Sequence, residues 1–222
     1  MPSIGVAICC YKGHIPHLGK LLDSIQGQSR LPEQVIVSCS SSLPEDIPYQ
    51  ASDYRFPLTF LTHSTYKNAS QNRNCAAAAL TTDIVSFFDA DDTMHPQRLQ
   101  FIDQCFATRD IKIFLHNGII HNSEPFEHYT SYYCLFNVLY RCPWGSTKVH
   151  SNMNEIMIFN GHATVRKEVL QDISFREEPE FHGKEDTVFC TDVITRYPHQ
   201  TAYCHNKLMN YSRGGTYGFI PV

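Results

Sequence analysis

Three carboxylates crowd into four residues at 89–92, where the sequence SFFDADD ends a short apolar run. Asp89, Asp91 and Asp92 repel one another, so their ionised forms are costly unless water or a cation neutralises them. Carboxylate oxygens suit Mg²⁺ or Mn²⁺, and Mg²⁺ commonly shares its shell with substrate phosphates. The same residues could form an acidic turn that caps the next helix, or a receiver-domain phosphoacceptor site, although receiver domains are shorter. The motif alone leaves these interpretations open.

The elements that must position these acids alternate between strands and helices. The predicted strands cover residues 4–10, 35–37, 58–62, 84–88 and 111–115, and the predicted helices cover residues 17–28, 68–80 and 95–108. This alternation predicts an α/β fold with a mainly parallel, doubly wound sheet and helices on both faces, whose ligands bind beyond the carboxyl ends of the strands. Tyr11, Cys39 and the acidic motif then share one rim of the sheet.

The second half of the sequence is less regular. Residues 118–153 show no clear periodicity, which is more typical of a functional loop region than of a second domain. Strands at 155–159 and 201–211 and helices at 166–172 and 185–196 are predicted beyond it. Because 222 residues are about one and a half times the modal domain length, we expect one domain over residues 1–222.

Composition excludes several classes of protein. Hydrophobic residues at 42% and charged residues at 18% describe a globular core and exclude a disordered or collagen-like chain. The formal net charge is -4 and no Lys/Arg cluster occurs, so neither nucleic acid nor an anionic membrane is expected as a partner. No apolar run approaches the roughly 20 residues of a membrane span, and no signal peptide is evident. We therefore expect a soluble protein.

The nine cysteines are an odd number, and several lie inside apolar runs. Buried free thiols of this kind are typical of packing residues. No C-x-x-C pair occurs, so a structural zinc site is not expected. This cysteine usage favours a reducing compartment, the cytoplasm.

Four elements in the first half resemble the nucleotide-binding half of glycosyltransferase family 2, whose members are inverting sugar transferases with the GT-A fold. They are the aromatic–polar pair at 11–12, SIQGQ at 24–28, NRNCA at 72–76 and DADD at 89–92. Their order and spacing match over about residues 4–110, which is far more specific than any one motif. The resemblance implies a single GT-A domain, with residues 1–117 as its nucleotide-sugar-binding half.

The resemblance continues in the acceptor-side half, residues 118–222. GHATVRKEVLQDISFRE at 161–177 is similar to the family's acceptor-side strand and helix, and GKEDTVFCTDV at 183–193 is similar to its catalytic-base element. YSRGGTYG at 211–218 resembles the closing segment more weakly. These matches imply that Asp186 is the general base, with Glu185 beside it.

The family's binding residues carry over onto this sequence as follows. The resemblance implies a nucleotide-sugar site made of Cys10, Tyr11, Lys12, Cys39, Ser40, Arg73, Asp89 and Ala90. It implies a Mn²⁺ or Mg²⁺ site made of Asp91 and Asp89. The closing segment often supplies a histidine to the metal or diphosphate, but this chain has Gly214 there, so His205 or Arg213 would substitute.

The implied roles agree with the chemistry of sugar transfer. The leaving diphosphate needs a divalent cation and a positive side chain such as Arg73, and the attacking hydroxyl needs a carboxylate base such as Asp186. Each residue also has a simpler interpretation. Asp186 would suit the dipole at a helix N-terminus, and Arg73 could lie on a helix surface.

Base recognition departs from the family pattern. An aspartate usually follows the second strand and binds the nucleobase, whereas this chain has Cys39 followed by Ser40, Ser41 and Ser42. A UDP-sugar remains the favoured donor, with the backbone or a serine hydroxyl replacing the carboxylate. We therefore expect this chain to recognise the base without the family's aspartate carboxylate.

The sequence thus predicts a metal-dependent, inverting glycosyltransferase that moves a hexose from a nucleoside diphosphate sugar to a hydroxyl of a glycan or glycoprotein. A sugar-nucleotide pyrophosphorylase is an alternative, but CCYKGHIPH is a poor version of its Gly-rich, basic loop. A catalytically inactive carbohydrate-binding or scaffold module is another, and Asp91 with Asp186 argues against it. We expect one module of a larger multidomain transferase.

Overall fold

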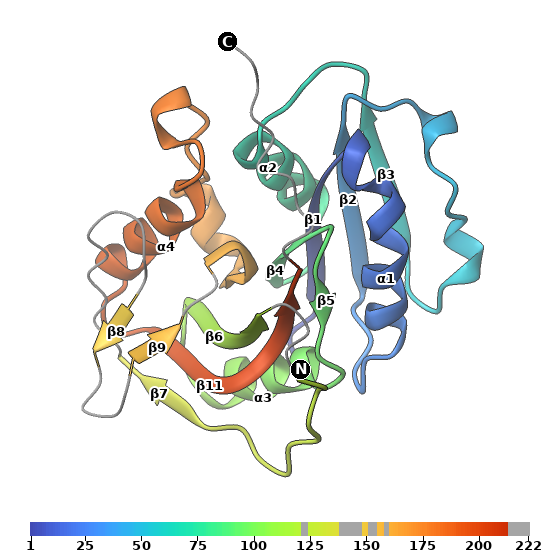
Figure 1. Cartoon of the computed structure of the whole chain (residues 1–222). Coiled ribbons are helices and arrows are strands. Elements are labelled where there is room, and N and C mark those ends of the chain that lie inside the picture. The colour runs from blue at the N-terminus through green and yellow to red at the C-terminus, as the bar shows by residue number, and fades with distance from the viewer. Residues whose placement is uncertain (121–123, 138–147, 151–154, 158–159, 213–222) are drawn as a thin grey trace.

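A nine-stranded sheet runs through the centre of the computed structural model, which describes residues 1–120, 124–137, 148–150, 155–157 and 160–212. The strands are β1 (Ile4–Tyr11), β2 (Gln34–Ser40), β3 (Leu58–His63), β4 (Ile84–Asp89), β5 (Thr93–Met94), β6 (Ile113–Ile120), β7 (Cys134–Phe136), β10 (Thr164–Arg166) and β11 (Thr201–Tyr211). Their order is β3-β2-β1-β4-β10-β6-β11-β5, and β7 pairs with β11 outside this path (Figure 1).

The first four strands form the parallel part that the alternating pattern predicts. β1 lies between β2 and β4 and runs parallel to both. The register pairs Cys10 with Cys39 and Cys9 with Asp89. The carboxyl ends of these strands therefore meet at one rim, and the residues that follow them are brought together there.

The second half adds strands of both directions. β10 is antiparallel to β4 and β6, and β11 is parallel to β6 but antiparallel to β5 and β7. The parallel ladders are the longer ones, so the sheet is mainly parallel. β11 curves across the sheet (Figure 1). Its last residues lie near the acidic motif, where Asn210 pairs with Thr93.

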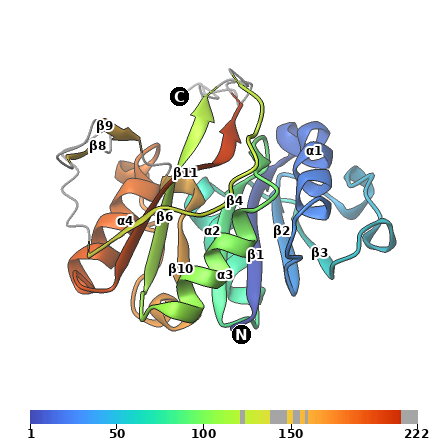
Figure 2. The same cartoon turned by 90° about the horizontal axis from the view of Figure 1, so that it is seen from below.

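Helices cover both faces of this sheet, which confirms the predicted α/β architecture (Figure 2). The helices α1 (Ile15–Gln26) and α3 (Arg98–Thr108) bury their apolar residues on one face, and α2 (Ala69–Ala79) and α4 (Glu185–Arg196) cover the other. In α1 the buried residues recur every three or four positions, as an amphipathic helix requires. None of the described helices combines the length and apolar character needed to cross a membrane.

The structure differs from the predicted elements mainly after residue 110. β6 continues to Ile120, and residues 164–166 form a strand followed by a 3₁₀ helix, Lys167–Gln171, where we expected a helix over 166–172. β10 forms because it can pair with β4 on one side and β6 on the other. The predicted loop region contains β7, and β8 (Lys148–His150) pairs with β9 (Glu155–Met157) in a separate two-stranded sheet. The pairing of β7 with β11, and of β10 with β4 and β6, joins segments far apart in the sequence and leaves no local periodicity.

Candidate active site

The guanidinium of Arg73 links three elements at the rim of the sheet. Its Nη2 donates to Asp89 Oδ1 at 2.7 Å, at the end of β4, and its Nη1 donates to Glu185 Oε1 at 2.8 Å, at the start of α4. The residue is 4% exposed, and its guanidinium lies over the ring of Phe175, 5.3 Å from the ring centroid. Burying three charges is favourable only when they pair, so this arrangement fixes the relative positions of α2, β4 and α4.

The helix that carries Arg73 begins at a well-formed cap. Asn68 accepts a hydrogen bond from the backbone N–H of Gln71, and the Gln71 side chain accepts one from the backbone N–H of Asn68. This capping box and the alanines that follow it favour helix at this point. The local sequence therefore presents Arg73 from the first turns of α2, facing the sheet.

Asp89 is held as an anion. Arg73 binds its Oδ1, and the Cys9 thiol donates to the same oxygen at 3.0 Å. Burial opposes its ionisation, but the charges of Arg73 and His162 outweigh burial and lower the pKa of Asp89 to about 2. A permanently charged carboxylate at this rim suits the binding of a cation or of sugar hydroxyls.

Glu185 and Asp186 are adjacent but have different surroundings. Glu185 is buried and engaged by Arg73. Asp186 accepts a hydrogen bond from the backbone N–H of Thr187 at 2.6 Å, and burial raises its pKa. A carboxylate that pairs with Arg73 is a poor base, whereas a desolvated carboxylate with a raised pKa takes up a proton more readily. Of the two acids, Asp186 is suited to accept a proton.

The structure brings together a candidate metal centre from Asp89, Asp92 and His162. One ligand atom from each lies within 4.8 Å of the others. Asp92 is 1% exposed, its Oδ2 lies 2.9 Å from His162 Nε2, and its Oδ1 accepts a hydrogen bond from the backbone N–H of Ser212. Burial raises the pKa of Asp92 to about 6. Two carboxylates and an imidazole are a donor set that fits Mn²⁺ or Mg²⁺, with Mn²⁺ better matched to the nitrogen.

Asp91 lies beside this group on the more open side of the acidic turn. Its Oδ2 is 3.9 Å from Nε2 of His14, and burial together with Asp89 raises its pKa. The His14 ring contacts the Tyr11 ring edge-on, with 4.2 Å between the centroids. The turn after β1 therefore faces the acidic turn after β4, as their parallel pairing requires. Ala90, between the acids, is fully buried.

Gly161 gives the site its tight packing. A Cβ on this residue would lie 2.7 Å from Asp89 Oδ2 and 3.2 Å from Arg73 Nη2, so no side chain fits there without movement. Gly161 belongs to a 3₁₀ turn, Asn160–His162, that leads into β10. The same turn supplies His162, so its close approach to Asp89 also sets the position of the imidazole.

The expected nucleotide-binding residues at the rim of β1 and β2 differ in their exposure to solvent. Tyr11 is 36% exposed, whereas Cys39 is fully buried in the core and Cys10 is 3% exposed. The Lys12 ammonium forms an ion pair with Asp46 at 2.9 Å, away from the acidic turn. The Ser40 hydroxyl donates to the backbone carbonyl of Lys67 and accepts a hydrogen bond from Asn72.

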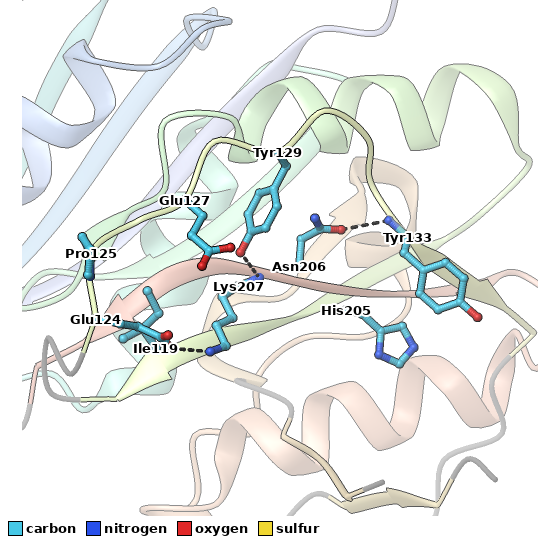
Figure 3. Close-up of a pocket in the computed structure, with 9 residues that line it drawn as sticks. All are labelled: Ile119, Glu124, Pro125, Glu127, Tyr129, Tyr133, His205, Asn206 and Lys207. Atoms are coloured by element: carbon cyan, nitrogen blue, oxygen red, sulfur yellow. Dashed lines mark hydrogen bonds and ion pairs between the residues drawn. The ribbon is translucent and has the colours of Figure 1, made fainter. Parts of the chain in front are cut away.

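His205 is placed apart from the acidic turn. It lines a separate cavity beside β11 (Figure 3), and it is not among the residues of the candidate metal centre. Arg213 and Gly214 lie outside the described residues.

Sequence reasoning missed several residues that the structure adds to the site. Gly161, Cys9 and His14 were not identified, and His162 was noted only as a residue of the acceptor-side segment. Gly161 and His162 open that segment, so the available signal was a glycine next to a histidine just before the strand that the family resemblance implies. Cys9 left none, because its contact with Asp89 depends on the pairing of β1 with β4.

The family model described as "Glycosyl transferase family 2" matches residues 5–174, which is more than half of the chain. No curated protein matched the sequence.

Solved structures with similar folds include TarS of S. aureus and a mannosyltransferase. TarS 1–349 in complex with UDP superposes with a TM-score of 0.68 at 16% identity, over 95% of this chain and 60% of that one. The complex of TarS 1–349 with UDP-GlcNAc gives a TM-score of 0.69, again at 16% identity, over 95% of this chain and 58% of that one. The mannosyltransferase PcManGT from Pyrobaculum calidifontis, in complex with GDP-Man and Mn²⁺, gives 0.65 at 16% identity over 96% and 58% of the two chains. This chain therefore spans about three fifths of the length of these structures. At 16% identity, the similarity shows that the chain shares their fold.

Proposed function

The chain belongs to glycosyl transferase family 2, and from this we propose that it is a metal-dependent, inverting glycosyltransferase that moves a hexose from a nucleoside diphosphate sugar to a hydroxyl of a glycan or glycoprotein. The observation that carries the proposal is the double contact of Arg73, which joins Asp89 at the end of β4 to Glu185 at the start of α4, the residue next to Asp186. A donor-binding group and a base are thereby held next to each other.

The donor lies along the rim of β1 and β4 in this proposal. The backbone of Cys10 and Tyr11 with the Arg73 side chain would hold the nucleotide, and Asp89, already ionised, would accept hydrogen bonds from the sugar or ribose. The Tyr11 ring, 36% exposed at this rim, would stack on the base. Lys12 would need to leave Asp46 before it could reach a phosphate.

A divalent cation would be held by Asp89, Asp92 and His162, with Asp91 from the same turn, and when bound it supplies Lewis-acid stabilisation of the leaving diphosphate. Arg73 adds a fixed positive charge beside it. A preorganised charge at the point where negative charge develops lowers the barrier without reorganisation during the reaction.

The acceptor reacts from the opposite face of the sugar. Its hydroxyl oxygen forms a bond to the anomeric carbon while the bond from that carbon to the diphosphate oxygen breaks, and Asp186 takes the hydroxyl proton. Glu185 does not compete for this role because Arg73 engages it. Its part is to hold Arg73 and the first turn of α4 in place.

A UDP-linked donor remains our proposal for the nucleotide. The similar structures were solved with UDP, UDP-GlcNAc and GDP-Man, so both uridine and guanosine nucleotides occur on this fold. Because Cys39 is buried in the core, we assign base recognition to the backbone at 40–42 and the neighbouring serine hydroxyls. The eight described cysteines are all free, which supports work in a reducing compartment such as the cytoplasm.

The acceptor is proposed to be a glycan or glycoprotein, with this chain acting as one module of a larger transferase. Its support is that the chain matches only about three fifths of the length of TarS 1–349. An acceptor domain contributed by another part of such an enzyme would complete the site.

The proposal is tested by metal-dependent release of nucleoside diphosphate from a panel of UDP- and GDP-sugars. The parent protein should hydrolyse a donor with Mn²⁺ and lose this activity with a chelator. Asp91→Asn should abolish Mn²⁺-dependent donor binding in calorimetry and keep the fold, while Asp53→Asn, an exposed acid in a 3₁₀ turn, serves as the matched control. Unchanged donor affinity in Asp91→Asn, or no release from any donor, would contradict the proposal.

A further inference from the structure

A hollow lies along β11, apart from the acidic turn. Its cavity of about 230 Å³ is bounded by β11, by the end of β6 and by the segment 124–133 that crosses them (Figure 3). This is smaller than the roughly 300–1,000 Å³ of sites for drug-sized ligands. The space suits one small ring.

Aromatic side chains form one wall of this cavity. Tyr133 is 51% exposed, and its ring lies 4.8 Å from the His205 ring, tilted by 38°. A large aromatic residue so exposed on a structured segment offers a flat apolar surface next to polar groups. The segment is held in place, because the Tyr133 backbone N–H donates to Asn206 Oδ1 and its carbonyl accepts from the His205 N–H.

The polar groups of the cavity suit a neutral ligand rich in hydroxyls. The Lys207 ammonium is paired with Glu124, so its charge is already neutralised (Figure 3). Among the described residues, the Glu127 carboxylate has no ion-pair partner and the buried Nε2 of His205 has no hydrogen-bond partner. An unpaired carboxylate repels a phosphate and accepts hydrogen bonds from hydroxyls.

The cavity is connected to the candidate active site through β11. Asn210 pairs with Thr93, which directly follows the acidic turn, and Ser212 donates its N–H to Asp92. Lys207 and His205 precede Asn210 by three and five residues, or at most roughly 10 and 16 Å along this strand, which is irregular between Cys204 and Asn210. That separation is longer than one sugar ring, so a ring bound here is not the one that reacts.

We propose that this cavity binds a neutral hexopyranose unit of the acceptor, one or more sugars away from the hydroxyl that attacks. The inference rests on the proposed function and extends it: the acceptor is an oligosaccharide, and Tyr133 and Glu127 select it. Tyr133 packs against a face of the ring and Glu127 accepts hydrogen bonds from its hydroxyls. Neither residue touches the donor.

Saturation-transfer NMR with the methyl glycosides of glucose, galactose, mannose and N-acetylglucosamine tests the site directly in the full chain. The parent protein should bind at least one of these probes, and Tyr133→Ala and Glu127→Gln should each weaken binding by about fivefold, the loss expected for one stacking or hydrogen-bonding contact. Tyr66→Ala, at an exposed tyrosine in the loop after β3, is the matched control and should bind as the parent does. UDP with Mn²⁺ should leave the bound glycoside in place.

Three results would overturn the inference: no binding of any glycoside by the parent, equal binding by Tyr133→Ala, or displacement of the glycoside by UDP with Mn²⁺. Donor hydrolysis is measured on the same samples and should be equal in the parent, Tyr133→Ala and Glu127→Gln. Glycoside binding without donor hydrolysis in the parent would contradict the proposed function and still support the sugar site. The two claims therefore fail separately.

Discussion

Adding one methyl group at Gly161 should damage the site by pressing on Asp89, without replacing any residue that binds the donor or the metal. In Gly161→Ala the new Cβ would lie 2.7 Å from Asp89 Oδ2, whereas ordinary contact begins near 3.4 Å. One partner must therefore move by roughly 0.7 Å. The Asp89 carboxylate cannot easily withdraw, because Arg73 and Cys9 hold its other oxygen at 2.7 and 3.0 Å.

The strain has a predictable size. Overpacking of this kind costs about 1–3 kcal/mol of folding free energy. If the structure relieves it by moving Asp89, the pair with Arg73 lengthens and the base on α4 shifts with it. A misplacement of about 1 Å can reduce a rate by about 10²-fold. We expect Gly161→Ala to lose about 10–100-fold in metal-dependent donor turnover.

Urea unfolding and steady-state donor hydrolysis measure the two effects. Gly27→Ala is the matched control, since its Cβ would meet only the carbonyl oxygens of Asp23 and Ser24 at 3.6 and 3.7 Å, an ordinary contact far from the site. Its turnover should equal that of the parent. A Gly161→Ala protein with the parent's stability and turnover would refute the close packing of the 3₁₀ turn against Asp89.

Three further predictions follow from the burial of individual side chains. Asp186→Asn should reduce the rate of transfer by about 10²-fold or more with little change in donor affinity. Because burial raises the pKa of Asp186, lowering the pH should reduce the parent's kcat/KM at a higher pH than an ordinary aspartate would. Burial raises the pKa of Asp92 from 3.8 to about 6, so the metal-free parent should lose up to roughly 3 kcal/mol of folding free energy as pH rises from about 4 through 6. Urea unfolding at several pH values should show this loss in the parent and not in Asp92→Asn. If the stabilities of the two proteins changed with pH in parallel, the burial of Asp92 would be contradicted. Cys39→Asp should destabilise the fold by about 2 kcal/mol or more, because it places a carboxylate in the core beside Cys10; tighter UDP binding at unchanged stability would instead place base recognition at Cys39.

The sequence by itself determined the order and type of most elements in the first half. The apolar runs that became β1 and β4, and the amphipathic spacing that became α1, are local patterns set by the geometry of strands and helices. The sequence also predicted which kinds of side chain lie at the rim. Three features occur in a fixed order along the chain: acids after a strand, a basic residue near the start of a helix, and a second acidic pair. These features identified the family.

Only the tertiary structure decided which of these side chains meet. Arg73 contacts acids 16 and 112 residues away, and Asp92 pairs with His162 because the turn before β10 folds over the end of β4. Cys39 faces the core and His205 a separate cavity. Each of these contacts depends on strand register and on packing between distant segments. Register and long-range packing produce no periodic pattern in the local sequence, because periodicity shows which face of an element is buried and not which element covers that face.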